Sequence, residues 1–143
     1  MRVYLDNCCF NRPFDDQTQT RIRLEAEAKL DIQQRVADKQ IELAWSYMLD
    51  YENEANPFEE RREAIQRWRH LATTDVEETS AVLQRAREIV GRGARPKDAL
   101  HIACALAAEC DYFLTTDDVL ARRMQGFAGI VVWNPTQFIV EVA

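Results

Sequence analysis

The chain has 143 residues, with 18 basic and 24 acidic side chains and a net charge of −6. This length suits a single domain over residues 1–143, which can bury a sizeable core without disulfides or a structural metal. No apolar run approaches the ~20 residues of a membrane span, and no signal-peptide pattern opens the chain. We therefore expect a cytoplasmic protein with no membrane partner. The acidic balance disfavours non-specific binding of polyanions.

The predicted elements alternate short apolar strands with longer amphipathic helices. Strands are expected at residues 3–5, 41–45, 111–115 and 130–133. Helices are expected at residues 20–38, 47–55, 57–72, 80–90, 97–109 and 117–124. Residues 7–19 are expected to form a loop, and residues 134–142 a helical turn or an edge strand. This alternation predicts an α/β fold built from β/α units around a parallel sheet.

The cysteines are Cys8, Cys9, Cys104 and Cys110. They form no C-x-x-C pair, and no histidine stands at zinc-ligand spacing. Adjacent cysteines cannot bond to each other without strain. We interpret them as small, buried, reduced residues, and expect Cys8 and Cys9 to pack beneath the end of the first strand.

Acidic residues follow the predicted strands or open the helices beside them. They are Asp6, Glu52, Asp98 and the pair Asp117–Asp118. Each one alone has a simpler role as a helix cap, a turn residue or a partner of a helix dipole. Together they are expected at one edge of the sheet, the carboxyl ends of the strands, where ligands bind in an open parallel sheet. Clustered carboxylates favour a hard cation such as Mg²⁺ or Mn²⁺, and such ions serve phosphodiester hydrolysis.

Four stretches of the sequence, "YLDN", "SYMLDYEN", "KDALHIACA" and "FLTTDD", resemble in their order and spacing the PIN-domain ribonucleases, including the VapC-type toxins. The resemblance implies a three-layer α/β/α sandwich with a central parallel sheet of four to five strands. It also implies a Mg²⁺- or Mn²⁺-dependent endoribonuclease that cleaves RNA. Many members of this family are toxins, so a small antitoxin partner and a homodimer are implied as well.

The resemblance also implies a role for each matching residue. Asp6, Glu52, Asp98 and Asp117 would form the catalytic set, with Asp6, Asp98 and Asp117 as metal ligands. Thr115, two residues before the last acid, would hold a metal-bound water, and Asn7 and Asp118 would support the site. Two alternatives stay open, namely Glu54 for Glu52 and Asp118 for Asp117. The sequence departs from the family where Asn7 and two cysteines directly follow the first aspartate.

Basic residues flank the proposed site and are candidates for phosphate contacts. They are Arg12, Arg92, Arg95, Lys97 and Arg122. For each of them the alternative is a solvated helix face. His101, one turn after Asp98, is expected to pack or hydrogen-bond in the core.

Two classes of function therefore compete. The first is a metal-dependent ribonuclease, the toxin of a toxin–antitoxin pair. The second is a non-catalytic PIN-fold module that binds protein partners. A phosphoryl-acceptor domain of the response-regulator kind is a weaker third, since no lysine follows a strand where it would neutralise a phosphoryl group.

Overall fold

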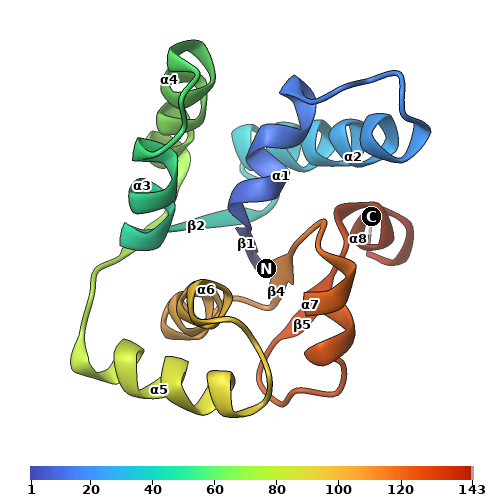
Figure 1. Ribbon diagram of the computed structural model, residues 1–143. Coiled ribbons are helices and arrows are strands. Elements are labelled where there is room, and N and C mark those ends of the chain that lie inside the picture. Colours follow the sequence, from blue (N-terminus) through green and yellow to red (C-terminus); the bar gives the residue numbers. More distant parts are fainter. Residues whose placement is uncertain (143) are drawn as a thin grey trace.

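A five-stranded parallel sheet forms the centre of the computed structural model, which describes residues 1–142 (Figure 1). Its spatial order is β3-β2-β1-β4-β5. The strands are β1 (Arg2–Leu5), β2 (Glu42–Ser46), β3 (Thr74–Val76), β4 (Tyr112–Leu114) and β5 (Val131–Trp133). The three central strands are buried almost throughout, as is typical of a parallel sheet that is covered on both faces.

Helices cover both faces of this sheet and give the expected three-layer α/β/α arrangement. Helices α5 and α6 lie on one side, and α1, α2 and α8 lie on the other (Figure 1). The α-helices are α1 (Asn7–Asn11), α2 (Thr20–Ala37), α3 (Tyr47–Glu54), α4 (Glu59–Trp68), α5 (Ser80–Gly91), α6 (Pro96–Ala107), α7 (Asp118–Arg123) and α8 (Pro135–Glu141). Two 3-10 helices, η1 (Arg12–Phe14) and η2 (Arg69–Leu71), complete the set. None of the helices within residues 1–142 is both long and apolar enough to cross a bilayer.

Side-chain caps explain where several helices begin. The Ser46 hydroxyl accepts from the Leu49 amide at the start of α3, as expected. The Thr79 hydroxyl accepts from the Val82 amide at the start of α5. Asn134 Oδ1 accepts from the Thr136 amide at the start of α8. Such caps satisfy backbone donors that the helix itself leaves free. The local sequence therefore placed most helix starts to within one or two residues.

Three segments differ from expectation. The expected loop at 7–19 opens with α1 and η1, because Asp6 caps the helix and Cys9 and Phe10 anchor it in the core. Strand β3 was not expected, since the sequence of Thr74–Val76 carries little apolar signal and the strand is only an edge. The helix expected over 57–72 is divided into α4 and η2. The undecided segment 134–142 forms α8.

The carboxyl ends of β1 and β4 meet at the point where the strand order reverses. The chain runs from β1 through β2 to β3 in one direction, and β4 and β5 then lie on the opposite side of β1. The Asp6 amide donates a hydrogen bond to the Leu114 carbonyl at 2.9 Å, so the ends of both strands are directly joined. In open α/β sheets this reversal point forms the crevice in which ligands bind.

Candidate active site

Asp6 lies at the end of β1 with both carboxylate oxygens engaged. Oδ1 accepts from the Asn7 amide at 2.8 Å. Oδ2 accepts from the Thr115 hydroxyl at 2.8 Å, and the Cys8 thiol lies 3.5 Å from the same oxygen. Only 7% of Asp6 is exposed. The carboxylate is therefore held in one orientation by groups from α1 and from the segment after β4.

Asp98 and Asp117 share the next part of the crevice. Asp98 stands in the first turn of α6, and Asp117 is the N-cap of α7, where Oδ1 accepts from the amides of Val119 and Leu120. Burial raises the pKa of Asp98 to about 6, and the charges of Asp6 and Asp117 add to the effect. Asp98 thus lies within electrostatic reach of both Asp6 and Asp117.

Glu52 projects from α3 toward α6. Its Oε1 lies 2.5 Å from Nε2 of His101, which is fully buried. Burial raises the pKa of Glu52, but the hydrogen bond and charge of His101 and the charge of Lys97 outweigh it, and the pKa is lowered overall. Glu54 is exposed on the same helix. Of the two glutamates left open by the sequence, Glu52 is the one that faces the buried core.

The sequence matches the model of a known protein family. The model described as PIN domain matches residues 3–124, which is most of the chain and includes all four acids. The chain belongs to the PIN domain family.

Two solved structures show the same fold. One is the crystal structure of VapBC2 from Rickettsia felis bound to a DNA fragment from their promoter, with 13% identity, a TM-score of 0.56 and coverage of 94% of this chain and 98% of that one. The other is VapBC-1 from nontypeable Haemophilus influenzae, with 12% identity, a TM-score of 0.58 and coverage of 95% and 99%. At this identity they support the fold alone. None of the curated proteins matches the sequence.

The three residues expected to support the site, Asn7, Thr115 and Asp118, have different hydrogen-bond partners in this PIN domain. Thr115 joins Asp6 to the Asp117 amide, which donates to its hydroxyl at 3.1 Å. Asn7 is near Glu52 and helps to lower the pKa of that residue, while its own Oδ1 is buried with no hydrogen-bond partner. Asp118 is exposed and pairs with Arg21, which binds both carboxylate oxygens at 2.6 and 2.7 Å. Of the pair left open, Asp117 is therefore the one beside Asp98.

Two of the five candidate phosphate-binding residues border the acids. Arg95 lines a cavity of about 70 Å³ together with Asp98 and Asp117. Lys97 lies next to Asp98 in the chain, with its ammonium 5.7 Å from the ring centroid of the exposed Tyr51. Both side chains are exposed and carry no ion pair within residues 1–142.

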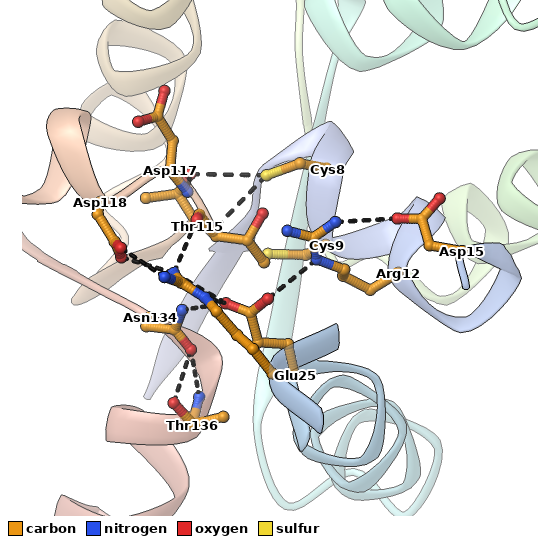
Figure 2. Close-up of polar contacts among 12 residues, drawn as sticks. Cys8, Cys9, Arg12, Asp15, Glu25, Thr115, Asp117, Asp118, Asn134 and Thr136 are labelled. Carbon is orange, nitrogen blue, oxygen red and sulfur yellow. Dashed lines mark hydrogen bonds and ion pairs between the residues drawn. The ribbon is translucent and has the colours of Figure 1, made fainter. Parts of the chain in front are cut away.

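The other three candidates do not line the cavity that Asp98 and Asp117 share. Arg12 binds Asp15 and Glu25 in a polar cluster beside α2 (Figure 2). Arg92 donates to the backbone carbonyls of Arg123 and Gln125. Arg122 lines a separate cavity of about 360 Å³ on the far part of α7. Arg12 and Arg92 are thus held by neighbouring groups, and Arg122 lines a different cavity from Arg95.

Three further residues lie in the site or next to it. Cys8 is half-buried with its sulfur 3.6 Å from Thr115 Oγ1, so it borders the acids, whereas Cys9 packs in the core as expected. Arg123 lines the same small cavity as Arg95. Tyr4 contacts His101 from the centre of the sheet. The different positions of Cys8 and Cys9 could have been predicted only if helix α1 had been predicted, because adjacent residues of a helix point about 100° apart.

The donor chemistry of the site fits a hard divalent cation. Asp98 has a raised pKa beside two further carboxylates, and a bound cation relieves that repulsion. The buried Asn7 Oδ1 offers a carbonyl oxygen that lacks a partner, and Mg²⁺ and Mn²⁺ prefer oxygen ligands. In the described part of the chain, however, no three acidic, cysteine or histidine side chains already form a ready metal-binding cluster.

Proposed function

We propose that this PIN domain is a metal-dependent endoribonuclease that hydrolyses RNA phosphodiester bonds. The observation that carries the proposal is the grouping of Asp98, in the first turn of α6, with Asp6 and Asp117 at the carboxyl ends of β1 and β4. Burial raises the pKa of Asp98 to about 6, and the charges of Asp6 and Asp117 add to the effect. Perturbed carboxyls in a crevice are typical of functional sites. Membership of the PIN domain family supports a nuclease over other functions of such a site.

Asp6, Asp98 and Asp117 would hold Mg²⁺ or Mn²⁺, with Asn7 Oδ1 as a neutral donor. When bound, such an ion lowers the pKa of a water molecule and neutralises charge on the phosphate. The protein supplies the orientation of these donors. Thr115 holds Oδ2 of Asp6 in place and also binds the amide of Asp117, so the end of β4 sets the relative position of two acids.

Glu52 is the group that we assign to proton transfer. Its pKa is lowered by His101, so the carboxylate is ionised at neutral pH and accepts a proton from the attacking water. His101 occupies Oε1, so Oε2 is the oxygen that we assign to this step. Asn7 beside it would orient the same carboxylate.

The substrate must be a polyanion that approaches an acidic crevice. Arg95 and Arg123 line the cavity of about 70 Å³ that contains Asp98 and Asp117, so phosphates on either side of the scissile bond have cationic partners next to the acids. Lys97 extends this edge toward Glu52. The local charge distribution thus compensates for the net charge of −6.

We further propose that the protein acts as the toxin of a toxin–antitoxin pair in the cytoplasm, as a homodimer with a small antitoxin partner. The two solved structures described above are VapBC structures, which supports this role. Co-expression with the product of an adjacent short reading frame should relieve growth inhibition caused by the wild-type protein. Growth inhibition that Asp98→Asn also produces would contradict a toxic nuclease.

The direct test is cleavage of mixed RNA by the pure protein with Mg²⁺, with Mn²⁺ and with EDTA. We expect cleavage that EDTA abolishes and that Asp98→Asn reduces by at least about a thousandfold, the scale on which loss of a principal catalytic group acts. Glu52→Gln should also abolish most activity, while the matched control Glu54→Gln on the exposed face of α3 should retain it. Cleavage that survives both EDTA and Asp98→Asn would overturn the proposal and favour a contaminant. Absence of any cleavage would favour a binding module.

A further inference from the structure

A row of hydrogen-bonded side chains runs from the core of the sheet to Glu52. The Tyr4 hydroxyl on β1 lies 2.6 Å from the Ser46 hydroxyl and 2.6 Å from Nδ1 of His101. Nε2 of the same imidazole lies 2.5 Å from Glu52 Oε1. The row joins β1, the consecutive elements β2 and α3, and α6, which are three separate parts of the sequence.

Glu52, at one end of the row, determines which group donates in each hydrogen bond. An ionised carboxylate only accepts hydrogen bonds, so Nε2 of His101, which lies 2.5 Å from Glu52 Oε1, carries the proton of this contact. The Tyr4 hydroxyl lies 2.6 Å from Nδ1, and it donates to this nitrogen whenever the imidazole is neutral. The Ser46 hydroxyl accepts from the Leu49 amide and is free to donate to Tyr4. Each hydroxyl therefore satisfies the next group along the row.

The row is rigid as well as connected. Ser46, Tyr4 and His101 are each 0% exposed. The Tyr4 ring stacks on Phe113 with 5.2 Å between centroids and an angle of 12°, and the His101 ring meets its edge at 5.7 Å. A buried polar row costs stability unless every member is paired, and apolar residues would fill this space more simply. Packing alone does not explain why the Tyr4 hydroxyl on β1 and the His101 imidazole on α6 are buried against each other.

We propose that His101, oriented by Tyr4, is a positioning residue that holds the Glu52 carboxylate in the rotamer needed for proton abstraction. This inference rests on the proposed ribonuclease function and assigns a role to two residues outside the acid set. His101 acts through Nε2–H, which fixes Oε1 and leaves Oε2 free. Tyr4 acts one step further back, because its hydroxyl fixes the plane and the tautomer of the imidazole.

The kinetic test compares Tyr4→Phe in two backgrounds. In the wild type it should lower kcat by about tenfold, the effect of one lost hydrogen bond, with KM little changed. In Glu52→Gln under single-turnover conditions it should have no further effect, because both changes disable the same carboxylate. The matched control is Tyr47→Phe, which removes a buried hydroxyl that has no partner, and kcat should not change. An equal loss from Tyr4→Phe in both backgrounds would show a purely structural role and overturn the proposal.

A second variant tests the donor itself. His101→Gln keeps an N–H group that reaches toward Glu52, whereas His101→Phe fills the space without a donor. We expect His101→Gln to recover most of the activity that His101→Phe loses, with similar unfolding midpoints for the two variants. Equal activity in both variants would contradict the assigned role of Nε2–H.

An NMR measurement separates this inference from the ribonuclease function. The chain has only two histidines, and His70 is exposed, so its ring serves as an internal reference. In ¹⁵N-histidine-labelled protein, we expect a slowly exchanging Nε2 proton on His101 that shifts in both Glu52→Gln and Tyr4→Phe. An Nε2 proton that is absent, or that Tyr4→Phe leaves unchanged, would overturn the positioning row even in an active enzyme. The expected shifts in a protein that cleaves no RNA would instead count against the ribonuclease function alone.

Discussion

The Thr115 hydroxyl donates a 2.8 Å hydrogen bond to Oδ2 of Asp6, across two neighbouring strands of the sheet. The same hydroxyl accepts from the amide of Asp117 at 3.1 Å. One short side chain therefore links the first acid of the site to the segment that carries the last. The relative position of these two acids depends on the pairing of β1 with β4, which continues to the Leu5–Leu114 pair at the carboxyl end of each strand.

Thr115→Val should lower RNA cleavage by about tenfold or more while the fold is retained. Valine has nearly the same shape, but it cannot hold Oδ2 of Asp6 or accept from the Asp117 amide, so both acids gain freedom. The measurement is kcat for RNA cleavage together with the thermal unfolding midpoint. Thr116→Val is the matched control, because the next hydroxyl along the chain makes no hydrogen bond to the site. Equal activity of the two variants would contradict a role for the Thr115 hydroxyl.

Asp98→Asn should remove a pH-dependent loss of stability in the metal-free protein. Burial, with Asp6 and Asp117, raises the pKa of Asp98 from 3.8 to about 6. The folded state then binds this proton more tightly than the unfolded state does, so stability falls as the pH rises through the window from 3.8 to about 6. We expect a loss of about 1–2 kcal/mol after allowance for solvent screening at this half-buried position.

This pH effect is measured by denaturant unfolding in EDTA across the same window. The free energy of unfolding of Asp98→Asn should decline less with rising pH than that of the wild type. Asp38→Asn, an exposed substitution at the end of α2, should follow the wild-type curve. Parallel curves for Asp98→Asn and the wild type would show that the pKa of Asp98 is not raised in the folded protein.

Replacing Arg95 and Arg123 together with glutamine should weaken RNA binding and reduce its salt dependence. Both guanidinium groups line the cavity that contains Asp98 and Asp117. Loss of two phosphate contacts on a single strand should reduce the slope of log K against log salt by about 1.4. Binding is measured in an Asp98→Asn background, which prevents cleavage. The control replaces Arg85 and Arg87 on the exposed face of α5, and an equal loss there would indicate only a general charge effect.

Glu25→Ala should destabilise the protein by about 3 kcal/mol, since removal of one partner leaves buried charge without compensation. Glu25 on α2 is 1% exposed and binds Arg12, Arg21 and Asn134 (Figure 2). The cluster ties α2 to η1 and to the start of α8. Denaturant unfolding checks the value, with Glu27→Ala on the exposed side of α2 as the control. A change below about 1 kcal/mol would mean that the cluster behaves like exposed ion pairs.

Much of the architecture could be read from local patterns. Short apolar runs placed four of the five strands, and caps such as Ser46 and Thr79 placed the helix starts, because hydrophobic periodicity and capping act over a few residues. Strand β3 was not predicted because an edge strand of three residues needs little apolar surface. Helix α1 was not predicted because so short a helix is stabilised by the burial of Cys9 and Phe10 in the core and not by local helix propensity.

The sequence by itself determined that four acidic segments follow or flank parallel strands, and hence that they share one end of the sheet. Only the tertiary structure decided which side chains enter the crevice. Glu52 meets His101 while Glu54 remains exposed, and Asp118 pairs with Arg21 while Asp117 stays beside Asp98. The physical reason is range: periodicity acts within one element, whereas the direction of a charged side chain depends on partners about 50 to 100 residues away.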